Sequence, residues 1–121
     1  MLAYYEKLIE YWKAGKTVEL YEYFNQWKKE GLLSKDEIEK LEKEVVPELE
    51  DLFIEQCEEN PATLYSVCNT VKRKRGWDDK TFCKEVGISQ EEFLGIKNCT
   101  SPKRKTKRIA HKVISILLEK G

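Results

Sequence analysis

Residues 77–98 read WDDKTFCKEVGISQEEFLGIKN, and this stretch decides the fold. Asp78 precedes a short apolar-periodic segment and is a typical helix N-cap. Gly87 follows that segment and suits a sharp turn that needs a positive φ. Ser89, with Glu92 three residues later, forms a capping box for a second short helix. Two short helices joined by about three residues with a glycine constitute a helix-turn-helix.

The apolar residues of this stretch predict the buried sides of the two helices. Their spacing and types resemble the lambda-repressor or Cro-type helix-turn-helix family, often called XRE. The resemblance covers about residues 61–118, which include a preceding helix and a closing helix, and it implies an all-α DNA-binding domain. The residues that carry it are Gly76, Trp77, Phe82, Cys83, Val86, Gly87, Ile88, Ser89, Phe93 and Ile96.

The resemblance also implies roles for single residues. The helix over residues 89–98 would lie in the major groove, with Gln90 placed to bond adenine bidentately. Lys72 and Asn98 stand where phosphate contacts are usual, and the following loop and helix start would meet the backbone through hydroxyls and cations. The expected DNA-contacting residues are Lys72, Lys80, Ser89, Gln90, Glu91, Lys97, Asn98, Thr100, Ser101, Lys103, Arg104 and Lys105.

Several residues depart from the family pattern. Asp79 puts a carboxylate where the family often binds phosphate through glutamine. Glu91 and Glu92 add negative charge to the expected recognition helix, although glutamate can accept from cytosine N4. Gly95 offers no side chain to a base, and Cys99 replaces the usual glycine after the helix. These residues are expected at the surface or at helix ends, so they do not change the predicted fold, but they weaken the prediction of specific base contacts.

Charge is divided between the two halves of the chain. Residues 1–60 hold 8 Lys, no Arg and 16 Asp or Glu, whereas residues 61–121 hold 10 Lys, 4 Arg and 6 Asp or Glu. The net charges are therefore −8 and +8, and the basic half indicates a polyanion as partner. Residues 103–108 alone supply five cations for phosphates. Alternatively, the two charge blocks are solvent-exposed helix faces that merely neutralise each other and indicate no partner.

The remaining sequence also indicates helices, so the predicted fold class is all-α. Pro47 predicts a break or kink at Val46, because proline lacks an amide donor and disfavours helix before it. Asn60 and Pro61 mark the boundary between an acidic helical bundle, residues 1–59, and the lambda-repressor-like domain, residues 60–121. The expected helices run from Leu2 to Lys13, Thr17 to Gly31, Ser34 to Pro47 and on to about Glu59, Ala62 to Lys74, and Lys103 to Leu118.

The acidic half is rich in aromatic residues, with nine of the thirteen in the chain. Its first two helices are expected either to form a homodimer interface or to cover a self-contained bundle with surface tyrosines. A dimer would place two recognition helices about one helical turn of DNA apart. The acidic half is also a candidate docking surface for a protein partner.

Other classes of function are not indicated. No apolar run approaches the roughly 20 residues of a membrane span, and no signal peptide is readable, so a cytoplasmic protein is expected. The four cysteines form no C-x-x-C pair, and His111 lies off the apolar stripe of its helix, so no metal, cofactor or catalytic site is expected. Neither a nucleophile elbow nor a Gly-rich phosphate loop is present, and the chain is not expected to be an enzyme.

The sequence thus predicts a small transcriptional regulator that binds duplex DNA through residues 61–121 and dimerises through residues 1–59. An antitoxin-like or adaptor protein that uses the helical scaffold for protein contacts is the alternative. A third hypothesis is internal masking, in which the acidic half covers the basic half and competes with DNA.

Overall fold

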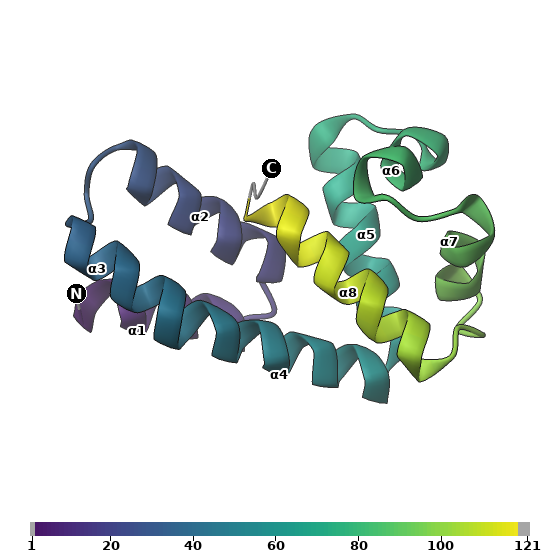
Figure 1. Ribbon diagram of the computed structural model, residues 1–121, viewed down its shortest axis with the longest axis horizontal. Helices are drawn as coiled ribbons and strands as arrows, with labels where there is room; N and C mark the ends of the chain where they lie inside the picture. The colour runs from purple at the N-terminus through teal and green to yellow at the C-terminus, as the bar shows by residue number, and fades with distance from the viewer. Residues whose placement is uncertain (1, 119–121) are drawn as a thin grey trace.

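The chain is described over residues 2–118 by a computed structural model, and its regular structure there is entirely helical (Figure 1). The predicted all-α class is therefore confirmed. The elements are α1 (Leu2–Lys13), α2 (Thr17–Lys29), α3 (Lys35–Lys40), the π-helical turn η1 (Leu41–Val45), α4 (Val46–Glu59), α5 (Pro61–Arg75), α6 (Asp79–Val86), α7 (Gln90–Lys97) and α8 (Lys103–Leu117).

Local capping explains where several helices begin. The Ser34 hydroxyl accepts from the Glu37 amide at 3.1 Å, and the Glu37 carboxylate accepts from the Ser34 amide at 3.0 Å. The Asn60 side chain accepts from the Ala62 amide at 3.2 Å and so opens α5 behind the proline at its first position. These caps satisfy amides that have no partner inside the helix.

Of the predicted break or kink at Pro47, the break is wrong. Val46 keeps helical dihedrals, and its amide donates to the Leu41 carbonyl five residues back, so α3, η1 and α4 form one continuous helix. A π turn inserts one extra residue into the helix. The π turn ends just before Pro47, so the missing amide of the proline and the local change in the helical hydrogen-bond pattern fall at the same place in the helix.

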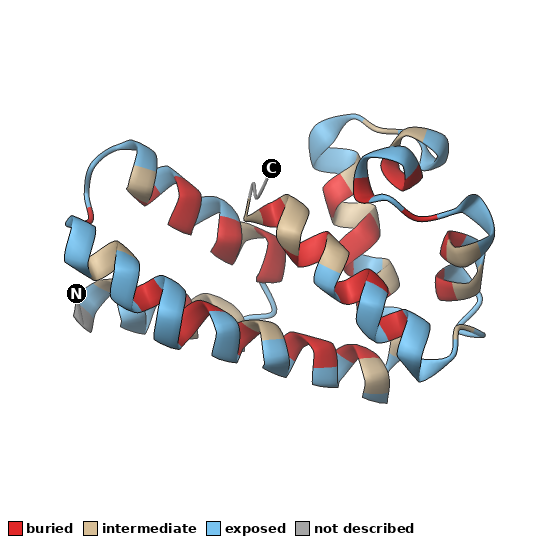
Figure 2. Ribbon diagram, in the orientation of Figure 1, coloured by how far each residue is buried: buried red, intermediate tan, exposed pale blue. Residues whose placement is uncertain are grey.

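One core runs through both halves of the chain. The buried apolar side chains form a single cluster, and Figure 2 shows them along the facing sides of α2, α4 and α8. Polar contacts also cross between the halves: Asn25 donates to the Leu117 carbonyl at 2.6 Å, and the His111 ring contacts Glu50 at 2.6 Å. The expected boundary at Asn60 is where α4 ends, and the division of the chain into two domains stays a prediction.

Candidate nucleic-acid interface

The connection between α6 and α7 has the local geometry that the sequence indicates. The Asp78 carboxylate accepts from the Thr81 amide at 2.7 Å, and this bond lowers the pKa of Asp78. Gly87 ends α6 with φ 86°, a conformation that strongly favours glycine. Ser89 and Glu92 then form the predicted capping box, with both hydrogen bonds at 3.0 Å.

Packing and one long-range contact hold this connection in place. Phe82 of α6 and Phe93 of α7 are buried with ring centroids 5.3 Å apart. Lys112 of α8 donates to the Gly87 carbonyl at 2.8 Å. The closing helix thereby fixes the turn that aims α7, a contact that the sequence reasoning missed because it joins residues 25 positions apart.

Lys72 is half-buried at the edge of the helix bundle. Its ammonium pairs with the Asp79 carboxylate and stands 5.3 Å from the centroid of the Phe93 ring, and its side chain is only 19% exposed. The two charges neutralise each other. Lys72, expected at a phosphate, is therefore engaged within the protein, and Asp79 is less repulsive to a polyanion than its sequence position suggests.

A second ion pair reduces the acidity of α7. Glu92 pairs with Arg108 of α8, and the Glu92 side chain is largely buried. Arg108 is consequently the member of the basic run that is occupied internally. Glu91 is exposed and has no ion-pair partner among residues 2–118.

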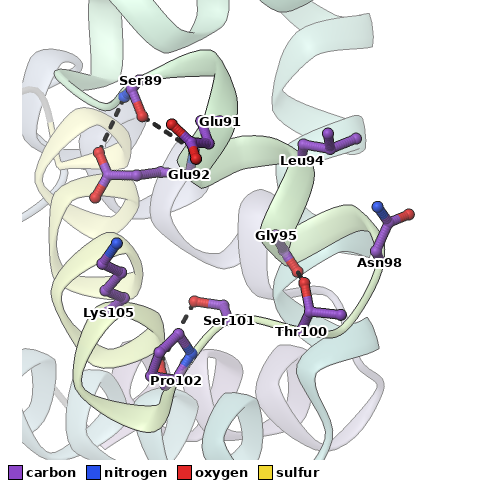
Figure 3. A pocket seen from close by; sticks show the side chains of 10 residues that line it. All are labelled: Ser89, Glu91, Glu92, Leu94, Gly95, Asn98, Thr100, Ser101, Pro102 and Lys105. Carbon is purple, nitrogen blue, oxygen red and sulfur yellow. Dashed lines mark hydrogen bonds between the residues drawn. The ribbon is translucent and has the colours of Figure 1, made fainter.

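The outward face of α7 is mixed in character. Gln90, Glu91, Lys97 and Asn98 are all exposed, as a base-reading surface requires. Leu94 stands among them and is 52% exposed, the largest value for a large apolar side chain in the described chain. Leu94, Glu91 and Asn98 are among the residues that line a groove beside α7 (Figure 3).

The groove lies between α7 and the start of α8 and has a volume of about 530 Å³ (Figure 3). Thr100 and Gly95 both line it, and the Thr100 hydroxyl donates to the Gly95 carbonyl at 3.4 Å. Lys105 of α8 borders one wall and the acidic start of α7 borders another. The lining residues are Ser89, Glu91, Glu92, Leu94, Gly95, Asn98, Thr100, Ser101, Pro102 and Lys105.

The structure thus brings six of the expected DNA-contacting residues to one groove. Gln90 and Lys97 line a neighbouring hollow of about 320 Å³ on the other side of Leu94. Lys80 is exposed on α6 and lies outside both hollows, and Lys72 is half-buried. The six at the groove are Ser89, Glu91, Asn98, Thr100, Ser101 and Lys105.

The start of α8 presents an uncompensated basic surface. Its N-cap, Pro102, makes no side-chain capping bond, so the first amides of the helix are not capped by a side chain. Four cations of the run are exposed and have no ion-pair partner within residues 2–118. They are Lys103, Arg104, Lys105 and Lys107, which we call the α8 basic surface.

Leu94 and Lys107 were not among the expected contact residues. The exposure of Leu94 could have been predicted from the sequence. Phe93 and Ile96 form the side of α7 that faces the core, and Leu94 lies outside that side. Lys107 lies one helical turn beyond Lys103 and so shares its side of α8.

The thiols lie mostly in the core. Cys57, Cys68 and Cys83 are buried, and burial raises the pKa of Cys57 to about 12 and that of Cys68 still further. Such thiols remain protonated at neutral pH. Over residues 2–118, no group of three or more His, Cys, Asp or Glu side chains is arranged to hold a metal ion.

Comparisons with protein-family models, with curated proteins and with solved structures find no match for this chain. None of the helices within the described residues is both long and apolar enough to cross a membrane.

Proposed function

We propose that this protein binds duplex DNA and acts as a small transcriptional regulator. The observation that carries the proposal is the α8 basic surface, whose four cations have no ion pair within residues 2–118 and which adjoins the exposed face of a helix-turn-helix. Lysine and arginine side chains free of internal ion pairs can release counterions from DNA, which drives sequence-independent affinity.

In this proposal α7 enters the major groove and α8 contacts the flanking backbone. Gln90, at the first position of α7, is exposed and can read a base edge. Thr100 and Ser101 supply hydroxyls, and Lys105 with the uncapped start of α8 supplies positive charge for phosphates. This way of binding DNA is the one that the resemblance to the lambda-repressor family implies, and it is part of the same proposal.

The acidic half serves as a homodimer module in this proposal. It presents exposed aromatic side chains, including Tyr5 at 37% and Tyr23 at 39%. Association through residues 1–59 leaves the α8 basic surface uncovered and raises apparent DNA affinity through avidity.

Neutralising part of the α8 basic surface tests the proposal. The triple variant Lys103→Gln, Arg104→Gln, Lys105→Gln should lower affinity for random duplex DNA at low salt by at least about tenfold. The slope of log affinity against log salt should become shallower by up to about 2.7, since each phosphate contact contributes about 0.9. Fluorescence anisotropy across a salt series measures both.

The matched control removes three exposed lysines from the acidic half, Lys16→Gln, Lys35→Gln, Lys40→Gln, with the same change in net charge. If both triple variants lose affinity equally, the effect is one of net charge and the assigned surface is wrong.

A second function is favoured by the exposed Leu94 and Glu91 on α7. An apolar side chain and an unpaired carboxylate suit a protein interface better than a phosphate backbone. In that case the chain is an antitoxin-like or adaptor protein. Its acidic face, with Glu44, Glu48 and Asp51 exposed along the long helix, would attract a basic partner. Absence of DNA binding at low salt would favour this function.

Internal masking has less support. The acidic half engages Lys74, whose ammonium lies 2.9 Å from Glu22, and His111 through Glu50. Over residues 2–118, none of its carboxylates pairs with the α8 basic surface.

A further inference from the structure

The outer side of α1 is a helix face without a partner in the described part of the chain. This helix packs mainly against α2, to which it turns Tyr4 and Tyr11, with ring centroids 4.9 Å from Trp27 and 4.8 Å from Tyr23. Its other side carries Tyr5, which is 37% exposed.

A hollow of about 390 Å³ lies along this outer side. Tyr5 and Ile9, one helical turn apart, form its apolar strip, and three exposed charged side chains border the strip. We call these residues the α1 face: Tyr5, Glu6, Ile9, Glu10 and Lys13.

Two of the three charged residues of the α1 face, Glu6 and Lys13, lie at equal distances from a point between Ile9 and Glu10, whereas Glu10 lies beside that point and would meet its own counterpart in a symmetric pair. Glu6 and Lys13 lie on the same side of the helix, two turns and about 10 Å apart along its axis. Neither has an ion-pair partner among residues 2–118. A two-fold axis between Ile9 and Glu10 places Glu6 of one copy opposite Lys13 of the second copy, and the reverse pair follows by symmetry.

We propose that the α1 face binds a second copy of this chain, with the two α1 helices antiparallel, an interface that rests on the homodimerisation proposed above. The two Ile9 side chains meet at the centre, the two Glu6–Lys13 pairs flank them, and each Tyr5 lies beside Ala14 of the second copy. A parallel arrangement sets Glu6 against Glu6 and Lys13 against Lys13, so charge selects the antiparallel one.

The size of the face sets the strength of this dimer. A three-turn helix pair buries less than the roughly 800 Å² per partner of a standard stable interface. We therefore expect reversible association with a dissociation constant on the order of tens to hundreds of micromolar.

This dimer also determines where the two α7 helices lie. The α1 helix runs along the long axis of the molecule, at the end opposite α7 (Figure 1). An antiparallel pair consequently puts its α7 helices at the two far ends. In this arrangement the two α7 helices do not face half-sites one helical turn of DNA apart, as the sequence had predicted for a dimer. The dimer would instead bridge two DNA segments or two distant sites.

Charge reversal tests the dimer without DNA, so its failure is distinct from failure of the proposed DNA binding. Glu6→Lys and Lys13→Glu each turn both symmetry-related pairs repulsive, and each variant alone should associate at least about tenfold more weakly than the parent chain. An equimolar mixture should form a heterodimer. The first variant carries lysine at both positions and the second carries glutamate at both, so each pair across their interface joins opposite charges. Sedimentation velocity, with native mass spectrometry for the mixture, measures each state.

The double variant Glu6→Lys, Lys13→Glu should regain the parent's self-association, since both pairs are restored with reversed sign. Lys7→Glu is the control, because Lys7 is exposed on α1 outside this face and the variant has the charge change of Lys13→Glu. The proposal is overturned if the parent chain stays monomeric up to about 1 mM. It is equally overturned if the mixed variants associate no better than each alone, or if Lys7→Glu weakens association as much as Lys13→Glu.

Discussion

At the residue scale, two glycines near the proposed interface differ in what they contribute. Gly87 has φ 86°, and a Cβ there would stand 3.5 Å from the Lys112 ammonium. Gly95 lies inside α7 without a positive φ, and a Cβ there would meet Ser101 at 3.8 Å, an ordinary contact distance. One glycine is required by the turn, and the other only weakens a helix.

Gly95→Ala should therefore raise the free energy of unfolding by about 0.5–1 kcal/mol through helix propensity. Gly87→Ala should lower it by roughly 1–2 kcal/mol, because alanine is strained in the left-handed region. Chemical denaturation monitored by circular dichroism measures both. Destabilisation by Gly95→Ala would mean that α7 packs against the loop more tightly than its contacts indicate.

The Lys72–Asp79 pair leads to a prediction about DNA affinity. Asp79→Asn removes the carboxylate that holds Lys72 and frees its ammonium near α7. We expect DNA affinity at low salt to rise several-fold, with the salt slope steeper by up to about 0.9.

Asp51→Asn is the matched control, since Asp51 is exposed on α4 and the change in net charge is the same. An equal gain from both variants in the anisotropy assay would show that only the total charge matters and that Lys72 does not reach DNA.

At the scale of elements, α8 both supplies the α8 basic surface and holds the turn before α7. Lys112→Met should lower the free energy of unfolding by about 1 kcal/mol, because the Gly87 carbonyl loses a charge-assisted hydrogen bond. Amide hydrogen exchange should increase in α6 and α7. Lys107→Met, on the same helix but exposed and without an ion pair in residues 2–118, should leave that exchange unchanged. Equal exchange in the two variants would contradict the role of Lys112.

The elements were largely predictable from sequence because their causes are local. The capping boxes of Ser34 and Ser89 act over three residues, and both form as expected. The break at Pro47 was wrongly predicted because the helix continues through a π turn just before the proline, and no residue type in the sequence predicts such a turn. Pairs such as Glu92–Arg108 depend on how α7 and α8 pack, which local patterns do not encode.

At the scale of the whole molecule, the shared core ties the two halves together. The closing helix packs along α4, and Asn25 of α2 bonds to the Leu117 carbonyl at its end. A fragment of residues 60–121 loses these partners and exposes the apolar side of α8. We expect it to lack the cooperative thermal unfolding of the full chain, as measured by calorimetry and near-ultraviolet circular dichroism. A sharp transition with native-like aromatic signals would instead show that the basic half folds independently.

The central claim is that the α8 basic surface contacts DNA phosphates. The most direct measurement is fluorescence anisotropy of the full chain on random duplex DNA between about 50 and 300 mM salt. With four cations that have no ion pair within residues 2–118, we predict a log–log salt slope of about −3 to −4, from about 0.9 for each neutralised phosphate. No binding at the lowest salt, or binding that does not change with salt, would contradict the claim.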